Sequence, residues 1–168
     1  MKFVVSSTEL LSHLTVVSMV ISSKNTLPIL DNFLFNLKGN DLEITASDLE
    51  TTLTTRIKLE NVTDDGQVAI PYRILVDTLK EFPEQPLTFD INKSNQAIKV
   101  STDTGEFNIV GQPAEDFPIK ATIKSESKVS LQLPATSLLS GISKTIFATA
   151  DDEMRPVMNG ILLELSDE

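Results

Sequence analysis

The amino-acid sequence predicts an α+β fold built from a unit of one strand, one helix and three strands that occurs twice and then begins again. Three stretches place apolar residues at the spacing of an amphipathic helix, and short runs rich in Val, Ile, Thr and Phe lie between them. The order of elements restarts after Asp-Asp-Gly at residues 64–66. Two such units can close a two-layer domain with its helices on one face and its antiparallel sheets on the other.

The first unit covers residues 3–59. Its helix, at about residues 8–21, begins at a Ser-Thr-Glu sequence whose hydroxyl groups can cap the first turn. The helical period places Leu10 and Leu14 on the face that we expect to pack against the sheets, and Ser12 on the opposite face. Short runs of β-prone residues predict its strands at residues 3–5, 33–37, 42–46 and 53–59. The last of these runs alternates and places Leu53, Thr55, Ile57 and Leu59 on one face.

The second unit repeats this order over residues 67–110. Pro71 stands where the first turn of a helix tolerates proline, and the apolar residues after it predict a short helix at about residues 72–82. The strands of this unit are expected at residues 67–70, 87–91, 97–101 and 107–110.

The first unit begins a third time after residue 128. A shift of 128 residues without a gap aligns residues 129–165 with residues 1–37 and gives seven identities. Conservative pairs such as Leu14 with Ile142 keep the apolar face of the helix, so a helix is expected at about residues 136–148.

This arrangement predicts how the chain divides into domains. Prolines followed by a stretch that contains Lys and Ser are typical of a connector. Because the third copy stops after its helix and next strand, we expect the chain to be the amino-terminal part of a longer repeat protein. The expected parts are domain one at residues 1–118, a connector at residues 119–128 and the beginning of an incomplete second domain at residues 129–168.

The composition excludes several classes of protein. The formal net charge of −10 would repel nucleic acid and anionic membranes if it were spread evenly. The absence of cysteine removes disulfides and thiolate metal sites, and the single histidine, His13, leaves no multi-histidine metal site. No run approaches the roughly 18 apolar residues of a membrane span, and the first residues do not have the pattern of a signal peptide. We therefore expect a cytoplasmic protein that binds no membrane, metal or cofactor.

Six short motifs occur in order along the whole chain. They are Met-Lys-Phe at residues 1–3, Leu-Leu at 10–11, Thr-Leu-Pro-Ile-Leu-Asp-Asn at 26–32, Ser-Asp-Leu-Glu at 47–50, Pro-Ala-Glu-Asp-Phe-Pro at 113–118 and Arg-Pro-Val-Met-Asn-Gly at 155–160. Together they closely resemble the bacterial DNA polymerase III β subunit, the sliding clamp. The resemblance implies a DNA-clamp, or processivity, fold. In that family three such domains make a chain, and two chains close a head-to-tail ring around duplex DNA.

The resemblance also implies the function. The protein would be a non-enzymatic processivity factor that tethers a replicative polymerase to duplex DNA. Its partners would be the DNA polymerase III catalytic subunit, the clamp loader and other clamp-binding replication and repair proteins. The full-length chain would be a head-to-tail homodimer. Because domain three is not part of these 168 residues, we expect this chain alone to be unable to close the ring.

The resemblance places basic residues near DNA. Lys24 lies in the loop after the first helix, and Arg155 lies in the equivalent loop of the repeat, although Pro156 and Val157 replace aromatic residues that are common there. Further candidates for the lining of the ring are Arg73, Lys80 and Lys144. The formal charges of the three predicted helices sum to zero, so the net charge of −10 lies elsewhere. This distribution favours phosphate against the helices and disfavours it on the outside.

The resemblance implies two further contact regions. Ile74 and Ile109, with Glu106 beside them, are expected at the joint of the ring. Relatives often carry arginine where Glu106 stands, which leaves the charge pairing across the joint open. Met158 is expected at the edge of the hydrophobic pocket that takes partner peptides, and most of that pocket would belong to later residues.

Two other classes of function compete with this interpretation. A β-rich extracellular adhesion or binding module built from tandem repeats is the first, and the helix in each repeat and the missing signal segment argue against it. An enzyme is the second, but no nucleophile–histidine–acid pattern and no phosphate-binding glycine motif occurs in the sequence. The acidic groups at Asp48 with Glu50 and at residues 151–153 do not have the ligand spacing of a calcium loop.

Overall fold

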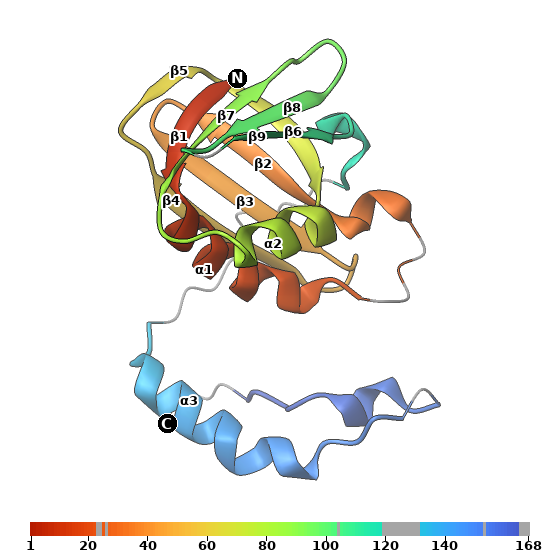
Figure 1. Ribbon diagram of the computed structural model, residues 1–168. Helices are drawn as coiled ribbons and strands as arrows, with labels where there is room; N and C mark the ends of the chain where they lie inside the picture. The colour runs from red at the N-terminus through yellow and green to blue at the C-terminus, as the bar shows by residue number, and fades with distance from the viewer. Residues whose placement is uncertain (23–24, 26, 104, 119–131, 153, 165–168) are drawn as a thin grey trace. The chain divides into compact units, whose positions relative to one another are not determined.

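The computed structural model describes residues 1–22, 25, 27–103, 105–118, 132–152 and 154–164. The chain divides into two compact units, Met1–Ala121 and Thr122–Glu168, which we describe separately (Figure 1). The expected connector at residues 119–128 lies outside the described residues. Within the described ranges, no helix has the length and apolar character that a membrane crossing requires.

The first compact unit, Met1–Ala121, contains both βαβββ units and folds into two antiparallel sheets. A five-stranded sheet has the order β5-β1-β7-β8-β9, and a four-stranded sheet has the order β4-β3-β2-β6. The strands are β1 Lys2–Ser6, β2 Asn32–Lys38, β3 Asp41–Ser47, β4 Thr52–Lys58, β5 Val62–Asp64, β6 Gly66–Pro71, β7 Pro86–Ile91, β8 Ala97–Ser101 and β9 Glu106–Val110. The eight predicted strands are therefore present, and only the three-residue β5 was not predicted.

Two helices lie side by side on one face of this unit: α1 (Ser7–Val17) and α2 (Tyr72–Lys80) (Figure 1). The Ser6 hydroxyl caps α1 by accepting a hydrogen bond from the Glu9 N–H at 3.4 Å. Leu10 and Leu14 are completely buried, whereas Ser12 is exposed, so the predicted orientation of α1 is confirmed. The α-helix ends earlier than expected because residues Ser18–Val20 continue as the 3-10 helix η1.

The two βαβββ units exchange their first strands. In element order β1 corresponds to β6 and β2 corresponds to β7. However, β1 pairs with β7, with Phe3 opposite Phe89, and β6 pairs with β2, with Val68 opposite Phe35. Each sheet thus contains three strands of one unit and the first strand of the other, which ties the two units into one domain.

The core lies between the sheets and the helices. Phe3 and Phe89 stack with ring centroids 4.9 Å apart, and Phe35 lies 6.5 Å from Phe89. All three rings are fully buried. Burial of aromatic rings of this size contributes a large part of the hydrophobic stabilisation of a small domain.

Two of the motifs that carry the family resemblance meet in a smaller core. Phe117, from the motif at residues 113–118, packs with Ile29 and Leu30 of the motif at residues 26–32. The Asn32 side-chain amide donates hydrogen bonds to the carbonyl oxygens of Pro28 and Ile29, which holds the 3-10 helix η2 (Pro28–Asp31) against the start of β2. These motifs therefore have a structural role in closing one end of the domain.

An ion-pair cluster joins the end of β5 to the amino terminus before β1 and to the turn between β7 and β8. The Asp64 carboxylate lies 2.7 Å from the Lys93 ammonium and 3.3 Å from the amino terminus of Met1. Both cations hold the pKa of Asp64 below its ordinary value of 3.8, and the hydrogen bond from Lys93 has the larger effect.

We expect Asp64→Asn to lower the melting temperature of the protein at neutral pH. Because the folded-state pKa of Asp64 is depressed, its contribution is present above the unfolded-state pKa and is lost as pH falls through the folded-state pKa. The difference between the two proteins should narrow in thermal melts from about pH 7 to about pH 3. Asp90→Asn serves as the control, because the contact of Asp90 with Lys2 is longer, at 3.7 Å. The control should therefore change the melting temperature less than Asp64→Asn does. A difference that does not change with pH would contradict this role of Asp64.

The second compact unit, Thr122–Glu168, repeats helical elements of the first compact unit. Helix α3 (Ala135–Thr145), η5 (Ile146–Ala148) and η6 (Pro156–Asn159) begin and end 128 residues after α1, η1 and η2. The expected strand that follows η6 is not formed in residues 160–164. In the first unit the equivalent β2 pairs with β3 and β6, and no such partners occur among the described residues of the second unit. The apolar helix face is exposed for the same reason: Leu138 is 42% exposed, whereas its equivalent Leu10 is buried.

Candidate nucleic-acid interface

The exposed face of α1 and α2 is the candidate surface for duplex DNA. On α1 this face carries the hydroxyl side chains of Ser12 and Thr15 and the exposed apolar side chain of Val16, and Met19 of η1 is exposed after it. The two hydroxyl groups donate to main-chain carbonyl oxygens of their own helix, Ser12 to Glu9 and Thr15 to Leu11. Small side chains that satisfy their own hydrogen bonds present a smooth surface without a fixed binding register.

Arg73 on α2 is held in place by its neighbour. Its Nε donates a hydrogen bond to the Tyr72 hydroxyl at 2.9 Å, and its guanidinium carbon lies 5.6 Å from the centre of the Tyr72 ring. The hydrogen bond from Arg73 to Tyr72 is the main reason why the pKa of Arg73 is raised. The Tyr72 ring in turn packs edge-on against Phe33, with centroids 6.2 Å apart. Arg73 is therefore an exposed, permanently charged group on an ordered support.

Lys80 stands on the same helix but shares its charge with an acid. Its ammonium lies 3.3 Å from the Asp77 carboxylate, and both side chains are more than half exposed. Exposed pairs at this spacing are weak and easily exchanged, so Lys80 can still turn to a phosphate. The spacing of three residues between Asp77 and Lys80 was visible in the sequence and could have identified this pair.

Arg155 of the second unit has a stronger local partner. Its Nε and one terminal nitrogen both lie 2.9 Å from the same oxygen of Asp152. Asp152 also accepts a hydrogen bond from the Met154 N–H, so the loop holds the carboxylate in place. By sequence the acids at residues 151–153 are considered only as possible calcium ligands, and the role of Asp152 as the partner of Arg155 comes from the structure. A phosphate would have to compete with this carboxylate for the guanidinium group.

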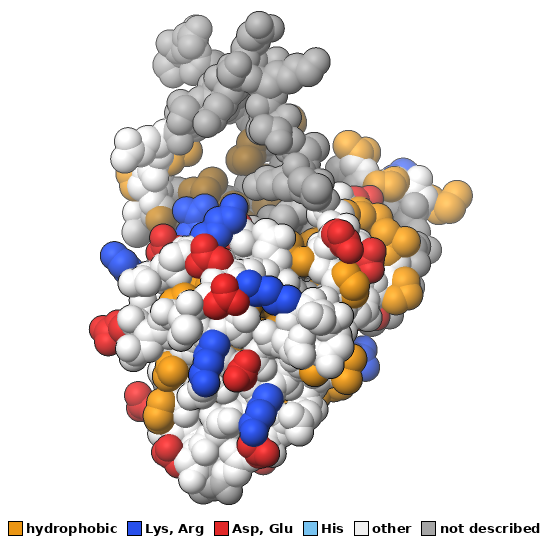
Figure 2. Space-filling view, turned by 90° about the horizontal axis from the view of Figure 1, so that it is seen from above, with side chains coloured by type: hydrophobic (Ala, Val, Ile, Leu, Met, Phe, Trp, Pro, Cys, Tyr) orange, Lys and Arg blue, Asp and Glu red, His pale blue; other side chains and the backbone are white. Residues whose placement is uncertain are grey.

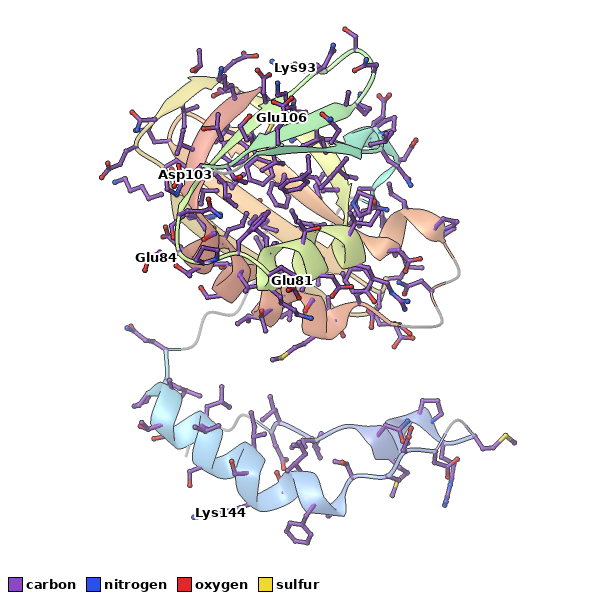
Figure 3. The ribbon with its side chains drawn as sticks, viewed as in Figure 1. Glu81, Glu84, Lys93, Asp103, Glu106 and Lys144 are labelled. Carbon is purple, nitrogen blue, oxygen red and sulfur yellow. The ribbon has the colours of Figure 1, made fainter. Side chains whose placement is uncertain are left out.

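The remaining basic candidates differ in what the structure provides. Lys144 is exposed in the last turn of α3 (Figure 3). Lys24 lies outside the described residues. Arg73 and Lys80 share one helix of the first unit, whereas Lys144 and Arg155 belong to the second unit.

The face of the molecule shown in Figure 2 carries charges of both signs. Figure 2 shows Lys and Arg side chains intermixed with Asp and Glu side chains on the face seen from above. In the five-stranded sheet and its turns, Lys2 is paired with Asp90 at 3.7 Å and Lys93 with Asp64 at 2.7 Å. The mixture of signs leaves no broad basic surface on the face shown in Figure 2 for sequence-independent phosphate binding.

The residues expected at the ring joint do not all reach the surface. Ile74 on α2 is 55% exposed, and Glu106 is exposed beside Lys99, whose ammonium lies 2.5 Å away. Ile109 is only 3% exposed, so its side chain belongs to the core of this chain. Successive side chains of a strand point to opposite faces, and Ile109 lies on the inner face while Glu106 lies on the outer one. The exposed apolar side chain of this strand is Val110.

Met158, expected at the edge of the peptide pocket, is 49% exposed in η6. Within the described ranges of the chain, no group of three His, Cys, Asp or Glu side chains is arranged to hold a metal ion.

Comparisons with known proteins agree with this fold. Residues 1–122 match the family model described as DNA polymerase III beta subunit, N-terminal domain. A beta sliding clamp from Pseudomonas putida is 33% identical over 166 residues, which is 99% of this chain and 44% of the relative. A beta sliding clamp from Vibrio cholerae is 32% identical and covers 98% of this chain and 44% of the relative.

Solved structures show the same similarity. The crystal structure of the DNA polymerase III subunit beta from Pseudomonas aeruginosa has a TM-score of 0.84 and 29% identity, and the match covers 95% of this chain and 43% of that chain. The chain thus spans less than half the length of the curated relatives that it matches. Because the family model matches well over half of these residues, the chain belongs to the DNA polymerase III beta subunit family.

Proposed function

We propose that the full-length protein is a DNA sliding clamp, a non-catalytic processivity factor that encircles duplex DNA and tethers the replicative polymerase. The observation that carries this proposal is the pair of helices on one face of two antiparallel sheets, in a chain whose family is that of the DNA polymerase III beta subunit. A ring of such domains holds DNA by topology, so individual phosphate contacts can be weak enough to allow sliding. The protein would act in the cytoplasm.

We assign the parts of the chain to this architecture. Residues 1–118 form clamp domain one, residues 119–128 form the connector, and residues 129–168 begin clamp domain two. The repetition of α1, η1 and η2 at a distance of 128 residues supports this assignment. The full-length protein would form a head-to-tail homodimer, and its partners would be the polymerase III catalytic subunit, the clamp loader and other clamp-binding replication and repair proteins.

The proposed contacts to DNA are Lys24, Arg73, Lys80, Lys144 and Arg155. Each would contact phosphate, and contacts to the phosphate backbone carry no sequence information directly. Ile74, Glu106 and Ile109, together with the main chain of β9, would contribute to the ring joint. Met158 would stand at the edge of the pocket for partner peptides.

The experiment that tests the function compares circular and linear DNA. The full-length protein, loaded by a clamp loader, should stay on a nicked circular duplex and should run off after the circle is cut. The 168-residue chain alone, as the control, should show no retention on the circle. Equal retention of the full-length protein on circular and linear DNA would refute topological binding.

The proposed phosphate contacts predict the salt dependence of DNA binding by the full-length protein. Lys24→Ala and Arg155→Ala should each lower the magnitude of the slope of log affinity against log salt by about 0.9, with no change in base preference. Asp152→Asn should raise the magnitude of this slope, in contrast to Arg155→Ala, because it removes the carboxylate that competes with phosphate for the Arg155 guanidinium. An unchanged slope in the Lys24/Arg155 double variant would return both residues to ordinary surface charges.

A further inference from the structure

A cleft of about 600 Å³ lies where β1 ends and α1 begins. It is lined by residues 4–6 of β1, by residues 58–61 at the end of β4, by residues 84–86 at the start of β7 and by Glu9 of α1. This volume is within the range of ligand sites in proteins. The cleft shares no residue with the proposed DNA contacts, the ring joint or the edge of the peptide pocket.

Hydrogen bonds hold both walls of the cleft in place. The Ser7 N–H donates to the Gln85 carbonyl oxygen at 2.9 Å, and the Gln85 N–H donates to the Ser7 hydroxyl at 3.0 Å. The same hydroxyl donates to the Pro83 carbonyl oxygen at 2.8 Å. On the other side, the Val4 N–H donates to the Asn61 carbonyl oxygen at 3.3 Å. The cleft is therefore formed in the free protein, which reduces the conformational entropy lost when a ligand binds.

Main-chain groups of β1 face this cleft without a strand beside them. Strand β5 pairs with β1 only as far as Phe3, opposite Val62, whereas β7 pairs with β1 as far as Ser6. The Val4 N–H bonds to the β5 side, and main-chain groups of alternate residues point to the same edge of a strand. The Val4 C=O and the Ser6 N–H therefore point to that side, where no strand of the described residues pairs with them. An unpaired stretch of edge is a template for another extended chain.

The charges around the cleft are mainly acidic. Glu9, Glu60 and Glu84 line it from three different segments, and Lys58 offsets one of these charges. All four side chains are exposed, and their formal charges sum to −2. Figure 3 shows Glu84 on the loop that joins α2 to β7. An acidic segment would be repelled here, whereas lysine or arginine would find partners on both walls.

We infer that this cleft takes an extended segment of a partner polypeptide that carries lysine or arginine. One residue of the segment would donate its N–H to the Val4 C=O and accept a hydrogen bond from the Ser6 N–H, which extends the pairing of β1 beyond the end of β5. The acids on the two walls would select the charge of the segment. This binding site is additional to the proposed clamp function and does not depend on it.

The test measures peptide binding to the 168-residue chain by calorimetry. Two blocked peptides of about six residues are compared, in which Val alternates with Lys in one and with Glu in the other. We expect the Lys peptide to bind about tenfold more tightly and to lose affinity as salt is added. It should also slow the exchange of the Ser6 amide hydrogen, which faces the cleft, and leave that of Val5, which faces β7, unchanged.

Two controls separate strand pairing from charge attraction. A Lys peptide that is N-methylated at a central residue lacks the N–H that pairs with Val4, and it should bind at least about tenfold more weakly. The double variant Glu60→Gln, Glu84→Gln should bring the affinities of the Lys and Glu peptides to within about threefold of each other. The matched variant Glu50→Gln, Glu115→Gln removes the same charge from residues that do not line the cleft and should keep the preference.

Each part of the inference has a result that would overturn it. Equal affinity of the unaltered protein for the Lys and Glu peptides would overturn the charge selection. Undiminished binding of the N-methylated peptide would overturn strand pairing, and a Lys peptide that does not bind would overturn the site itself. None of these results would affect retention of the full-length protein on circular DNA, which tests the clamp function.

Discussion

Replacing Leu14 with alanine is expected to lower the free energy of unfolding by about 2–5 kcal/mol. Leu14 is completely buried on the face of α1 that packs into the main core. Truncation removes three buried carbon atoms and leaves a cavity that the surrounding rings and strands can fill only in part. Chemical denaturation of the 168-residue chain, followed by circular dichroism, measures the loss.

The matched control for Leu14 is Ser12→Ala on the opposite face of the same helix. Ser12 is exposed, and its hydroxyl donates only to the Glu9 carbonyl oxygen of its own helix. We expect this variant to change the free energy of unfolding by no more than about 0.5 kcal/mol. Equal losses from the two variants would mean that the packing of α1 is not what the structure describes.

Gly111→Ala is the second substitution with a large expected effect, a loss of about 1–3 kcal/mol. A Cβ atom at Gly111 would lie 2.8 Å from a methyl carbon of Val68 and 2.9 Å from the main-chain oxygen of Ala69. The main-chain oxygen cannot move aside easily, because Ala69 and Gln112 exchange two hydrogen bonds at the point where β6 meets the end of β9. The same denaturation measurement detects the loss.

Gly105→Ala is the control for Gly111. No atom lies within 4 Å of a Cβ at Gly105, and its backbone does not adopt a positive φ. We expect a change within about 0.5 kcal/mol. A comparable loss at Gly105 would point to a general cost of replacing glycine in these hairpins, and the close approach at Gly111 would no longer explain the result.

The basic residues of the candidate site came from the resemblance and from position along the chain, while their partners came from the structure. Asp77 before Lys80 is a local pair that the sequence displays, because side chains three residues apart on a helix can meet. Tyr72 and Arg73 are adjacent, and adjacent side chains on a helix do not face each other by spacing alone, so their contact comes from the structure. The partner of Arg155 depends on the path of a loop, which spacing alone does not define. Strand alternation alone could have predicted that Ile109 is buried where Glu106 is exposed, since residues 106 and 109 must face opposite sides of one strand.

The sequence by itself determined the elements of this protein and their repetition. Each helix and nearly every strand follows from a local pattern, because the period of apolar residues decides which face of a segment can be buried. The 128-residue repeat determined the positions of α3, η5 and η6 for the same reason.

Only the tertiary structure decided how the strands are shared. The exchange of β1 and β6 between the two sheets joins residues that are far apart in the chain, such as Phe3 with Phe89 and Val68 with Phe35. Each first strand contains three consecutive apolar residues, at 3–5 in β1 and at 68–70 in β6, so the local pattern does not choose between the two sheets. The pairing is decided by the joint packing of two sheets on two helices, a property of the whole domain. The same physics leaves residues 160–164 of the second unit without a strand, because a strand forms only where a neighbour completes its hydrogen bonds.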